Sequence, residues 1–298
     1  MKIIAQTGYT GSNSAEITEV PEDKLLPSSL EITTTFVPLL PYDVYKLNGK
    51  IPVNIPSVLG YGALGKVTKT GALRSKKHLG ERVLVLNPAG TFKEKIVASI
   101  PPLTIAIPDE VSDEQAGAII GGLDTALTLA KKIKESGVET IVLTGANSVI
   151  GLALLQLLKD SGLQILPMVR KKSQDYFEAK REEFGLPDYP EIADISPQNT
   201  LVVDIAGQEN LLAPYLSSGF KVLSIALQNT PGVRFVSEFV FPGEYVKMFD
   251  WLKSGKVVLP IDQVFSYKEI RKAVDYQAEN PSRGRNLIAF GNDVPVMQ

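Results

Sequence analysis

A run of small and polar residues, TGANS at 144–148, separates two apolar segments near the middle of the chain. A dinucleotide fold needs small residues where a strand turns into a helix, because the backbone approaches the pyrophosphate there. The frame here is Gly145, Ser148 and Gly151, so a serine replaces the middle glycine. Its hydroxyl and N–H can bind a phosphate while the side chain caps the helix. The residues predicted to contact a bound dinucleotide are Gly145, Asn147, Ser148, Val149, Ile150 and Gly151. The alternative is a plain strand–helix turn without a ligand.

Three cations, Arg170, Lys171 and Lys172, directly follow the second apolar segment. An NAD enzyme carries an acidic residue at this place, which binds the ribose 2′-hydroxyl, whereas a basic residue accommodates a 2′-phosphate. Cations at a helix N-terminus are electrostatically unfavourable, and a bound anion would relieve that. The cluster therefore predicts NADPH as the cofactor. The alternative is a solvated basic start to a charged helix.

The elements that position these residues form one βαβ unit. Residues 141–143 are predicted as a buried strand, 149–159 as a helix with one apolar face, and 163–169 as a second strand. Further strands are predicted at 191–195, 201–205, 221–226 and 233–240, and helices at 171–184, 209–216 and 245–253. About six strands with intervening helices indicate a doubly wound parallel sheet of the Rossmann type.

The segments on either side differ from this α/β pattern. Residues 1–110 hold short apolar runs at 30–37, 83–86, 92–98 and 104–107, with one helix at 42–47, which indicates a barrel-like β domain. Ser112 with Gln115 resembles a capping box, and two helices separated at Gly121-Gly122 follow. Strands at 263–265 and 285–290 flank a helix at 267–277. The predicted domains are 1–110, completed by 263–298, and 111–262.

Composition excludes several classes of protein. Among 298 residues, Lys and Arg number 31 and Asp and Glu 33, so no charge excess indicates nucleic-acid binding. Cysteine is absent, which excludes disulfides, thiolate zinc sites, iron–sulfur clusters and a cysteine nucleophile. The start lacks the apolar core of a signal peptide, and no apolar run reaches the roughly 20 residues of a membrane span. We expect a cytoplasmic protein with no membrane partner.

Local matches along nearly the whole chain resemble the medium-chain dehydrogenase/reductase superfamily, and within it the zinc-independent quinone oxidoreductase branch. Some features are similar to the 2-enoyl thioester reductases. The matching segments are PLLPYD at 38–43, GKIP at 49–52, GYGALG at 60–65, LDTA at 123–126, NS at 147–148, VR at 169–170, GFKV at 219–222 and GRNL at 284–287. The resemblance implies a GroES-like β-barrel domain beside the Rossmann-type domain.

The resemblance also implies roles for single residues. Thr125 stands where the family has a helix start beside the nicotinamide, and Arg285 where it has a basic residue that faces the cofactor. Tyr45 stands where similar quinone reductases carry a tyrosine in the substrate cleft; it is the candidate proton donor, with packing of the β domain as the alternative. Asp43 and Asp204 are expected in structural roles. A homodimer through an edge strand at 233–240 is the expected assembly.

Departures from the family pattern limit what the resemblance implies about the reaction. His78 is the single histidine, lies in a basic run and is expected at the surface, so no metal site is predicted. Leu40, Ile51 and Gly62 replace polar residues of the family. The resemblance therefore predicts an NADPH-dependent, zinc-independent reductase that transfers hydride to a quinone or an α,β-unsaturated carbonyl. The alternatives are an NADPH-binding redox sensor with little catalysis and a divergent enoyl thioester reductase, which Asn147-Ser148 favour and Ile51 opposes.

Overall fold

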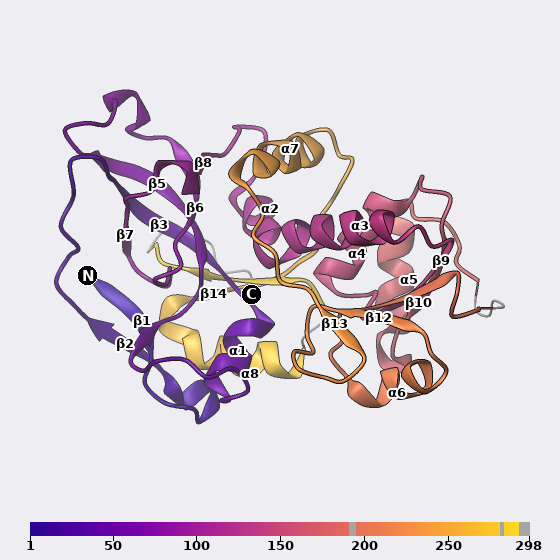
Figure 1. Cartoon of the computed structure of the whole chain (residues 1–298). Helices are drawn as coiled ribbons and strands as arrows, with labels where there is room; N and C mark the ends of the chain where they lie inside the picture. The colour runs from indigo at the N-terminus through magenta and orange to yellow at the C-terminus, as the bar shows by residue number, and fades with distance from the viewer. Residues whose placement is uncertain (191–194, 281–282, 292–298) are drawn as a thin grey trace. The chain divides into compact units, whose positions relative to one another are not determined.

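The computed structural model describes residues 1–190, 195–280 and 283–291, and the chain divides into two compact units (Figure 1). Unit 1 comprises Met1–Ile120, Pro242–Lys253 and Pro260–Gln298, and unit 2 comprises Gly121–Phe241 and Ser254–Leu259. The sequence predicted a first boundary after residue 110 and assigned 242–253 to the nucleotide domain. The structure groups both 111–120 and 242–253 with unit 1.

Unit 2 holds a parallel sheet of five strands in the order β10-β9-β11-β12-β13. The strands are β9 (Thr140–Thr144), β10 (Gln164–Met168), β11 (Thr200–Asp204), β12 (Lys221–Ser224) and β13 (Val233–Phe235). The helices are α3 (Asp124–Ser136), α4 (Val149–Leu158), α5 (Gln174–Glu183) and α6 (Glu209–Ser217). All four strand pairs are parallel, and the chain moves from one side of β9 to the other between β10 and β11. The predicted doubly wound sheet is confirmed.

The central strands of this sheet are buried on both faces. Every residue of β9 and β11 is buried, which their β-branched and aliphatic composition predicted. Helix α4 buries eight of its ten residues and packs against α3. Full burial of an aliphatic side chain contributes about 1.5–3 kcal/mol. The sheet edge that carries the β9–α4 turn is therefore attached to a rigid core.

One strand prediction for unit 2 differs from the structure, and another falls largely outside the described residues. The strand predicted at 233–240 was too long, because β13 ends at Phe235. Its partner β12 ends at Ser224, which is in register with Phe235, so the ladder stops there apart from one bond from the Val236 N–H to the Ser224 carbonyl at 2.8 Å. The first four residues of the strand predicted at 191–195 lie outside the described residues.

Unit 1 is mainly β structure. One sheet has the order β14-β15-β3-β5-β6-β8, with β7 paired to β3, and another has the order β2-β1-β4. Its strands are β1 (Lys2–Gln6), β2 (Ala15–Glu19), β3 (Leu30–Leu39), β4 (Ser57–Val58), β5 (Gly62–Thr70), β6 (Arg82–Leu86), β7 (Lys95–Ala98), β8 (Thr104–Ala106), β14 (Ile261–Ser266) and β15 (Arg285–Ala289). Its helices are α1 (Pro41–Leu47), α2 (Asp113–Ala118), α7 (Pro242–Lys253) and α8 (Ile270–Glu279). Strand β15 pairs with β3 in antiparallel fashion, so the predicted return of the tail to the β domain is confirmed.

The segment between α2 and α3 was predicted wrongly as a break at Gly121-Gly122. The structure has a π-helical turn at Ile119–Leu123 instead. The Asp124 carboxylate accepts from the Gly121 and Gly122 N–H groups at 3.1 Å each, which satisfies donors that a break would have left to water. The Ser112 cap is confirmed, since its hydroxyl accepts from the Gln115 N–H at 3.2 Å. No helix of the described part of the chain is long and apolar enough to cross a bilayer.

Candidate functional site

The turn from β9 into α4 has the backbone that close approach of a phosphate requires. Gly145 has a φ of +66°, a conformation that favours glycine. A Cβ on Gly151 would lie 2.5 Å from the Ala146 carbonyl oxygen and 2.6 Å from that of Gly145, so only glycine fits there. Ser148 is the N-cap of α4, and its hydroxyl accepts from the Gly151 N–H at 3.0 Å. The first helical N–H groups thus face the end of the strand, where an anion would bind.

A buried polar network fixes the loops around this turn. The Thr144 hydroxyl donates to Asp204 Oδ1 at 2.6 Å, and the Ser224 hydroxyl donates to Asp204 Oδ2 at 2.7 Å. All three side chains are fully buried. The Thr144 hydroxyl also accepts from the N–H groups of Ile205 and Ala206, at 3.1 and 3.2 Å. One carboxylate therefore joins the carboxyl ends of β9, β11 and β12, and the structural role predicted for Asp204 is confirmed.

This network lies where ligands bind in open parallel sheets. The strand order reverses at β9, with β10 on one side and β11 on the other, and such switch points form the crevice of doubly wound folds. A Cβ on Gly145 would lie 3.2 Å from the Ala206 nitrogen, which shows how closely the two loops approach. The sequence did not reveal this three-strand connection. A buried strand ending in Asp, beside one ending in Thr, was the signal for it.

The basic cluster follows the strand next to this turn. In the β9–β10 pair Met168 is in register with Thr144, so Arg170 and Gly145 leave the same edge of the sheet. Arg170, Lys171 and Lys172 are all exposed. A 3-10 turn at Lys171–Ser173 precedes α5, and the Ser173 N–H donates to the Arg170 carbonyl at 2.7 Å. The predicted charged helix begins slightly later than expected, and the cations stand on the turn before it.

Thr125 lies in the first turn of α3, which packs against α4. Its N–H and hydroxyl both donate to Asp124 Oδ1, at 2.5 and 3.1 Å. The side chain is half-buried. Asp124 thus fixes the direction of the Thr125 hydroxyl. Sequence reasoning missed Asp124, although an aspartate at a helix start is a recognised capping signal.

The remaining predicted residues belong to unit 1. Tyr45 lies on α1, is half-buried and has the Lys50 ammonium 5.0 Å from its ring centroid. Arg285 is the first residue of β15 and is 3% exposed. Asp43 closes the N-terminus of α1 by accepting from the Leu40 N–H at 3.0 Å, and from the Gly60 N–H at 3.2 Å, which confirms its predicted structural role. Burial raises the pKa of Asp43, against the lowering effect of these bonds and of Lys46 and Arg285.

Comparison with known proteins places this arrangement among solved folds. No family model matches the chain. The quinone oxidoreductase from Coxiella burnetii superimposes with a TM-score of 0.79 over 98% of this chain and 99% of that one, at 20% identity. CurK enoyl reductase superimposes with a TM-score of 0.77 over 97% and 99%, at 16% identity. The chain has the quinone oxidoreductase fold. The predicted fold class, a Rossmann-type sheet with a GroES-like β domain, is thereby confirmed.

Sequence relatives agree with the quinone oxidoreductase fold. The chain is 28% identical over 171 residues to a quinone oxidoreductase of Pseudomonas aeruginosa. The matched segment covers 56% of this chain and 52% of that protein. It is 22% identical over 262 residues to the mitochondrial enoyl-[acyl-carrier-protein] reductase of Arabidopsis thaliana, covering 80% and 67%. The match to the bacterial relative thus spans about half of that protein's length. The resemblance to the quinone oxidoreductase branch of the medium-chain dehydrogenase/reductase superfamily is confirmed.

Within the quinone oxidoreductase fold, apolar side chains fill places that the family pattern gives to polar ones. A Cβ on Gly62, which replaces a glutamate of that pattern, would lie 2.8 Å from Ile120 Cδ1. Leu40, which replaces an asparagine, is 4% exposed. His78 is half-buried, with Nδ1 2.8 Å from Glu81 Oε2. The described residues contain no group of three or more side chains that could hold a metal ion.

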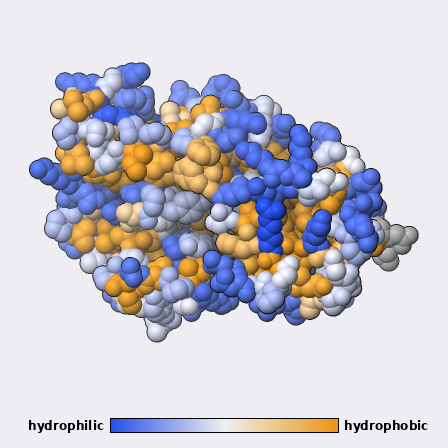
Figure 2. Space-filling view, viewed as in Figure 1, coloured by the Kyte–Doolittle hydropathy of each residue, from blue (hydrophilic) through white to orange (hydrophobic). Residues whose placement is uncertain are grey.

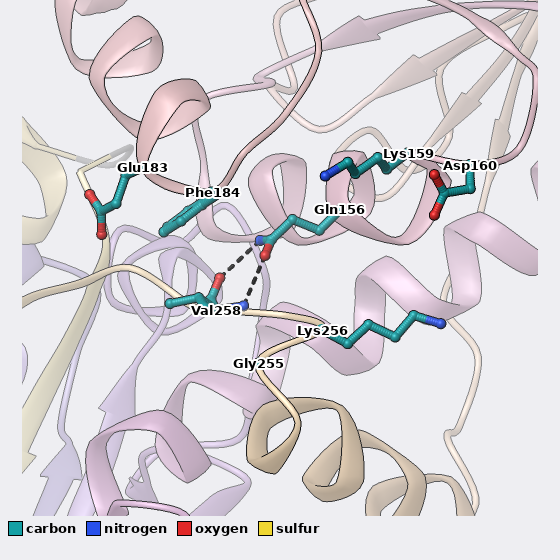
Figure 3. Close-up of a pocket in the computed structure, with 8 residues that line it drawn as sticks. All are labelled: Gln156, Lys159, Asp160, Glu183, Phe184, Gly255, Lys256 and Val258. Carbon is teal, nitrogen blue, oxygen red and sulfur yellow. Dashed lines mark hydrogen bonds between the residues drawn. The ribbon is translucent and has the colours of Figure 1, made fainter.

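A cavity of about 390 Å³ lies at the other end of α4 (Figure 3). Its lining residues are Gln156, Lys159, Asp160, Glu183, Phe184, Gly255, Lys256 and Val258. The Gln156 amide donates to the Val258 carbonyl and accepts from the Val258 N–H, each at 2.9 Å. A helix of ten residues is roughly 15 Å long, which separates the cavity from the β9–α4 turn. The cavity is therefore distinct from the nucleotide turn. The two bonds between Gln156 and Val258 in its wall attach the segment Ser254–Leu259 to α4.

Proposed function

We propose that the chain is an NADPH-dependent, zinc-independent oxidoreductase that reduces a quinone or an α,β-unsaturated carbonyl. The observation that carries the proposal is the position of Arg170, Lys171 and Lys172. These exposed cations follow the strand next to the Gly145–Gly151 turn and leave the same sheet edge. A phosphate-binding turn beside a basic cluster matches a dinucleotide that carries a 2′-phosphate.

The residues of unit 2 fit such a cofactor. The N–H groups at the start of α4 bind the pyrophosphate, with the positive end of the helix dipole behind them. The Ser148 hydroxyl accepts from Gly151, which leaves its own proton free to be donated to a phosphate oxygen. Arg170 holds the 2′-phosphate through charge-assisted hydrogen bonds. NADPH supplies a hydride when bound.

The resemblance to the family assigns the remaining roles to two residues of unit 1 and one of unit 2. Arg285 is proposed to face the cofactor, and Thr125 of unit 2 to lie beside the nicotinamide. Tyr45 is proposed to donate the proton that completes reduction, with water as the other donor. The Lys50 ammonium lies 5.0 Å from the centroid of the Tyr45 ring. If turnover of Tyr45→Phe equals that of the parent chain across quinones and enones, Tyr45 is not the donor.

A titration with NADPH and NADH tests the cofactor assignment, and a panel of quinones and enones tests the reaction. We expect tighter binding of NADPH than of NADH and sustained oxidation of NADPH with at least one quinone. Equal affinities for the two cofactors would refute the role of the basic cluster. A complex with NADPH would show which side chains surround the nicotinamide, and so identify the substrate class.

A second function, an NADPH-binding redox sensor with little catalysis, is supported by one observation. Ile120 occupies the space beside Gly62, and Leu40 is buried, so two places that the family pattern makes polar are apolar here. Such a site binds the cofactor but offers fewer groups to polarise a substrate carbonyl. Tight NADPH binding without turnover on any quinone or enone would support the sensor and oppose the reductase.

A homodimer through the edge of the unit 2 sheet is also proposed. Strand β13 lies at that edge, and an exposed edge strand is usually covered in proteins. Phe239 is 60% exposed and Phe241 71%, and their rings stack edge to face at 5.6 Å. These rings would lie beside the paired edge. A monomer in light scattering would remove the proposal. A cytoplasmic location remains a prediction from the sequence.

A further inference from the structure

Three loops of unit 1 each carry a large aliphatic side chain that protrudes into water. Leu26 is 45% exposed, Ile100 is 56% exposed and Leu73 is 79% exposed. They belong to the loops 20–29, 71–81 and 99–103, which connect strands of the unit. Single exposed aliphatics are common, but several on adjoining loops indicate an interaction surface.

Hydrogen bonds hold the three loops together. The Leu73 N–H donates to the Pro27 carbonyl and the Gly71 N–H to the Ser29 carbonyl, both at 2.8 Å. The hydroxyls of Ser29 and Ser99 are 3.0 Å apart. The loop of Leu26 is thus bonded both to the loop of Leu73 and to the loop of Ile100. The side chains of Leu26, Leu73 and Ile100, with the cations described next, are called the loop surface.

Four cations belong to the same loops: Lys24, Lys76 and Lys77 are exposed, and Arg74 is half-buried. Among the described residues, none of these four side chains has an ion pair or hydrogen bond. Lys76 and Lys77 belong to the 3-10 turn that begins after Ser75, and they follow Leu73 closely in the sequence. Their charge is therefore available to a partner.

Two of the three carboxylates of these loops are already paired with lysines. Glu22 pairs with Lys95, and Asp23 pairs with Lys93 at 3.3 Å. Glu81 lies 2.8 Å from His78. The loop surface is therefore positively charged around its aliphatic side chains. In Figure 2, apolar surface at the upper left is framed by hydrophilic surface, in the region where Figure 1 has the loop between β5 and β6.

We propose that the loop surface binds the surface of an anionic lipid bilayer. Protruding aliphatic side chains enter the boundary between headgroups and acyl chains, and lysine and arginine beside them reach the phosphates. Each cation near an anionic leaflet adds to binding, and four unpaired cations with three aliphatics supply both signals that reversible binding requires. An acidic protein would need the cations but not the protruding Leu73. This binding needs no membrane-spanning helix, and it differs from the expectation from the sequence that the chain has no membrane partner.

Sedimentation of the full chain with vesicles tests the proposal without depending on turnover. We expect binding to vesicles of phosphatidylcholine with phosphatidylserine, and little binding to phosphatidylcholine alone. Lys76→Glu with Lys77→Glu should weaken binding by about 30-fold or more. Lys134→Glu with Lys221→Glu makes the same change in net charge at exposed lysines of unit 2 and should weaken it far less. Leu73→Ser should weaken binding by about tenfold, whereas Ile17→Ser on β2, also exposed, should not.

Two results would overturn the proposal. One is equal binding to neutral and anionic vesicles, or none to either. The other is binding to soluble polyglutamate that requires Lys76 and Lys77, together with no binding to vesicles and no effect of Leu73→Ser. That combination would assign the loop surface to an acidic protein. Circular dichroism of each variant shows that the fold is intact, and these outcomes are independent of NADPH binding.

Discussion

The Thr144 hydroxyl lies 2.6 Å from Asp204 Oδ1, and this contact joins the ends of two adjacent parallel strands at the candidate nucleotide site. The same hydroxyl accepts from two N–H groups of the loop after β11. Because donor and acceptor are fully buried, water cannot replace either of them. The backbone around Gly145 is therefore held in place before any ligand binds.

Thr144→Val tests this network. The variant leaves a buried carboxylate with one donor fewer and two N–H groups without an acceptor, so we expect a loss of about 3 kcal/mol in the free energy of unfolding. We also expect weaker NADPH binding. Thr140→Val is the control, since Thr140 is buried on the same strand but makes a single longer bond of 3.3 Å to Gln164. If denaturant titration shows equal losses for both variants, the network does not have the proposed importance.

Ser148→Ala and Ser112→Ala form a matched pair of cap variants. Each serine caps a helix by accepting the N–H three residues later, at 3.0 and 3.2 Å. Each change should cost about 1 kcal/mol of stability. NADPH affinity, measured by calorimetric titration, should fall only for Ser148→Ala, because only that hydroxyl is proposed to contact phosphate. Unchanged affinity would assign Ser148 to helix capping alone.

Arg170→Ala tests the cofactor preference. Loss of a hydrogen bond to a charged group costs about 1.5–3 kcal/mol, so NADPH affinity should fall by roughly 10- to 150-fold while NADH affinity stays the same. Lys159→Ala removes an exposed cation at the other end of α4 and should change neither affinity. A parallel loss of both affinities would mean that Arg170 does not distinguish the cofactors.

The sequence predicted most of unit 2, because strands buried on both faces are continuous apolar runs. The βαβ unit that begins at β9 was predicted with boundaries within one or two residues. Prediction from the sequence failed where contacts between distant elements decide the end of a strand or the form of a turn. The end of β13 depends on where β12 stops, and the turn at Ile119–Leu123 depends on the Asp124 carboxylate. Neither dependence is encoded in local periodicity.

The sequence predicted only those parts of the candidate site that lie within one short segment of the chain. The Gly145–Gly151 turn and Arg170 follow from residue types and spacing, because each belongs to one strand end. The connection of Thr144 with Asp204 joins residues 60 positions apart, and no periodic pattern marks it. Ile120 beside Gly62 is a similar case. The sequence shows that Gly62 replaces a polar residue of the family, but it does not show that Ile120 fills the space beside it.

Gln156→Leu tests the attachment of Ser254–Leu259 to α4. The change removes both bonds to Val258 and leaves a backbone N–H and carbonyl without these partners, so we expect a loss of about 2 kcal/mol in stability (Figure 3). Gln156→Glu keeps the bond from the Val258 N–H but places a buried carboxylate oxygen against the Val258 carbonyl, so its loss should be at least as large. Stability equal to the parent chain in Gln156→Leu would show that packing alone holds this segment.

Tyr189→Phe tests a prediction for alkaline pH. Burial raises the pKa of Tyr189 to about 12, whereas an unfolded tyrosine titrates near 10. Between these values the folded phenol keeps its proton and the unfolded one loses it, so stability falls as the pH rises through this window. The variant should lose less stability than the parent chain between pH values of about 9 and 11, measured by urea unfolding. An identical decline in both chains would contradict this account.

The proposed reaction is the oxidation of NADPH, in preference to NADH, with reduction of an activated carbonyl compound. Steady-state oxidation of the two cofactors, followed side by side with a series of quinones, tests it most directly. We expect sustained turnover with NADPH, formation of one hydroquinone for each NADPH oxidised, and much lower kcat/KM with NADH. Equal kcat/KM for the two cofactors, or no turnover of NADPH with any quinone or enone, would contradict it.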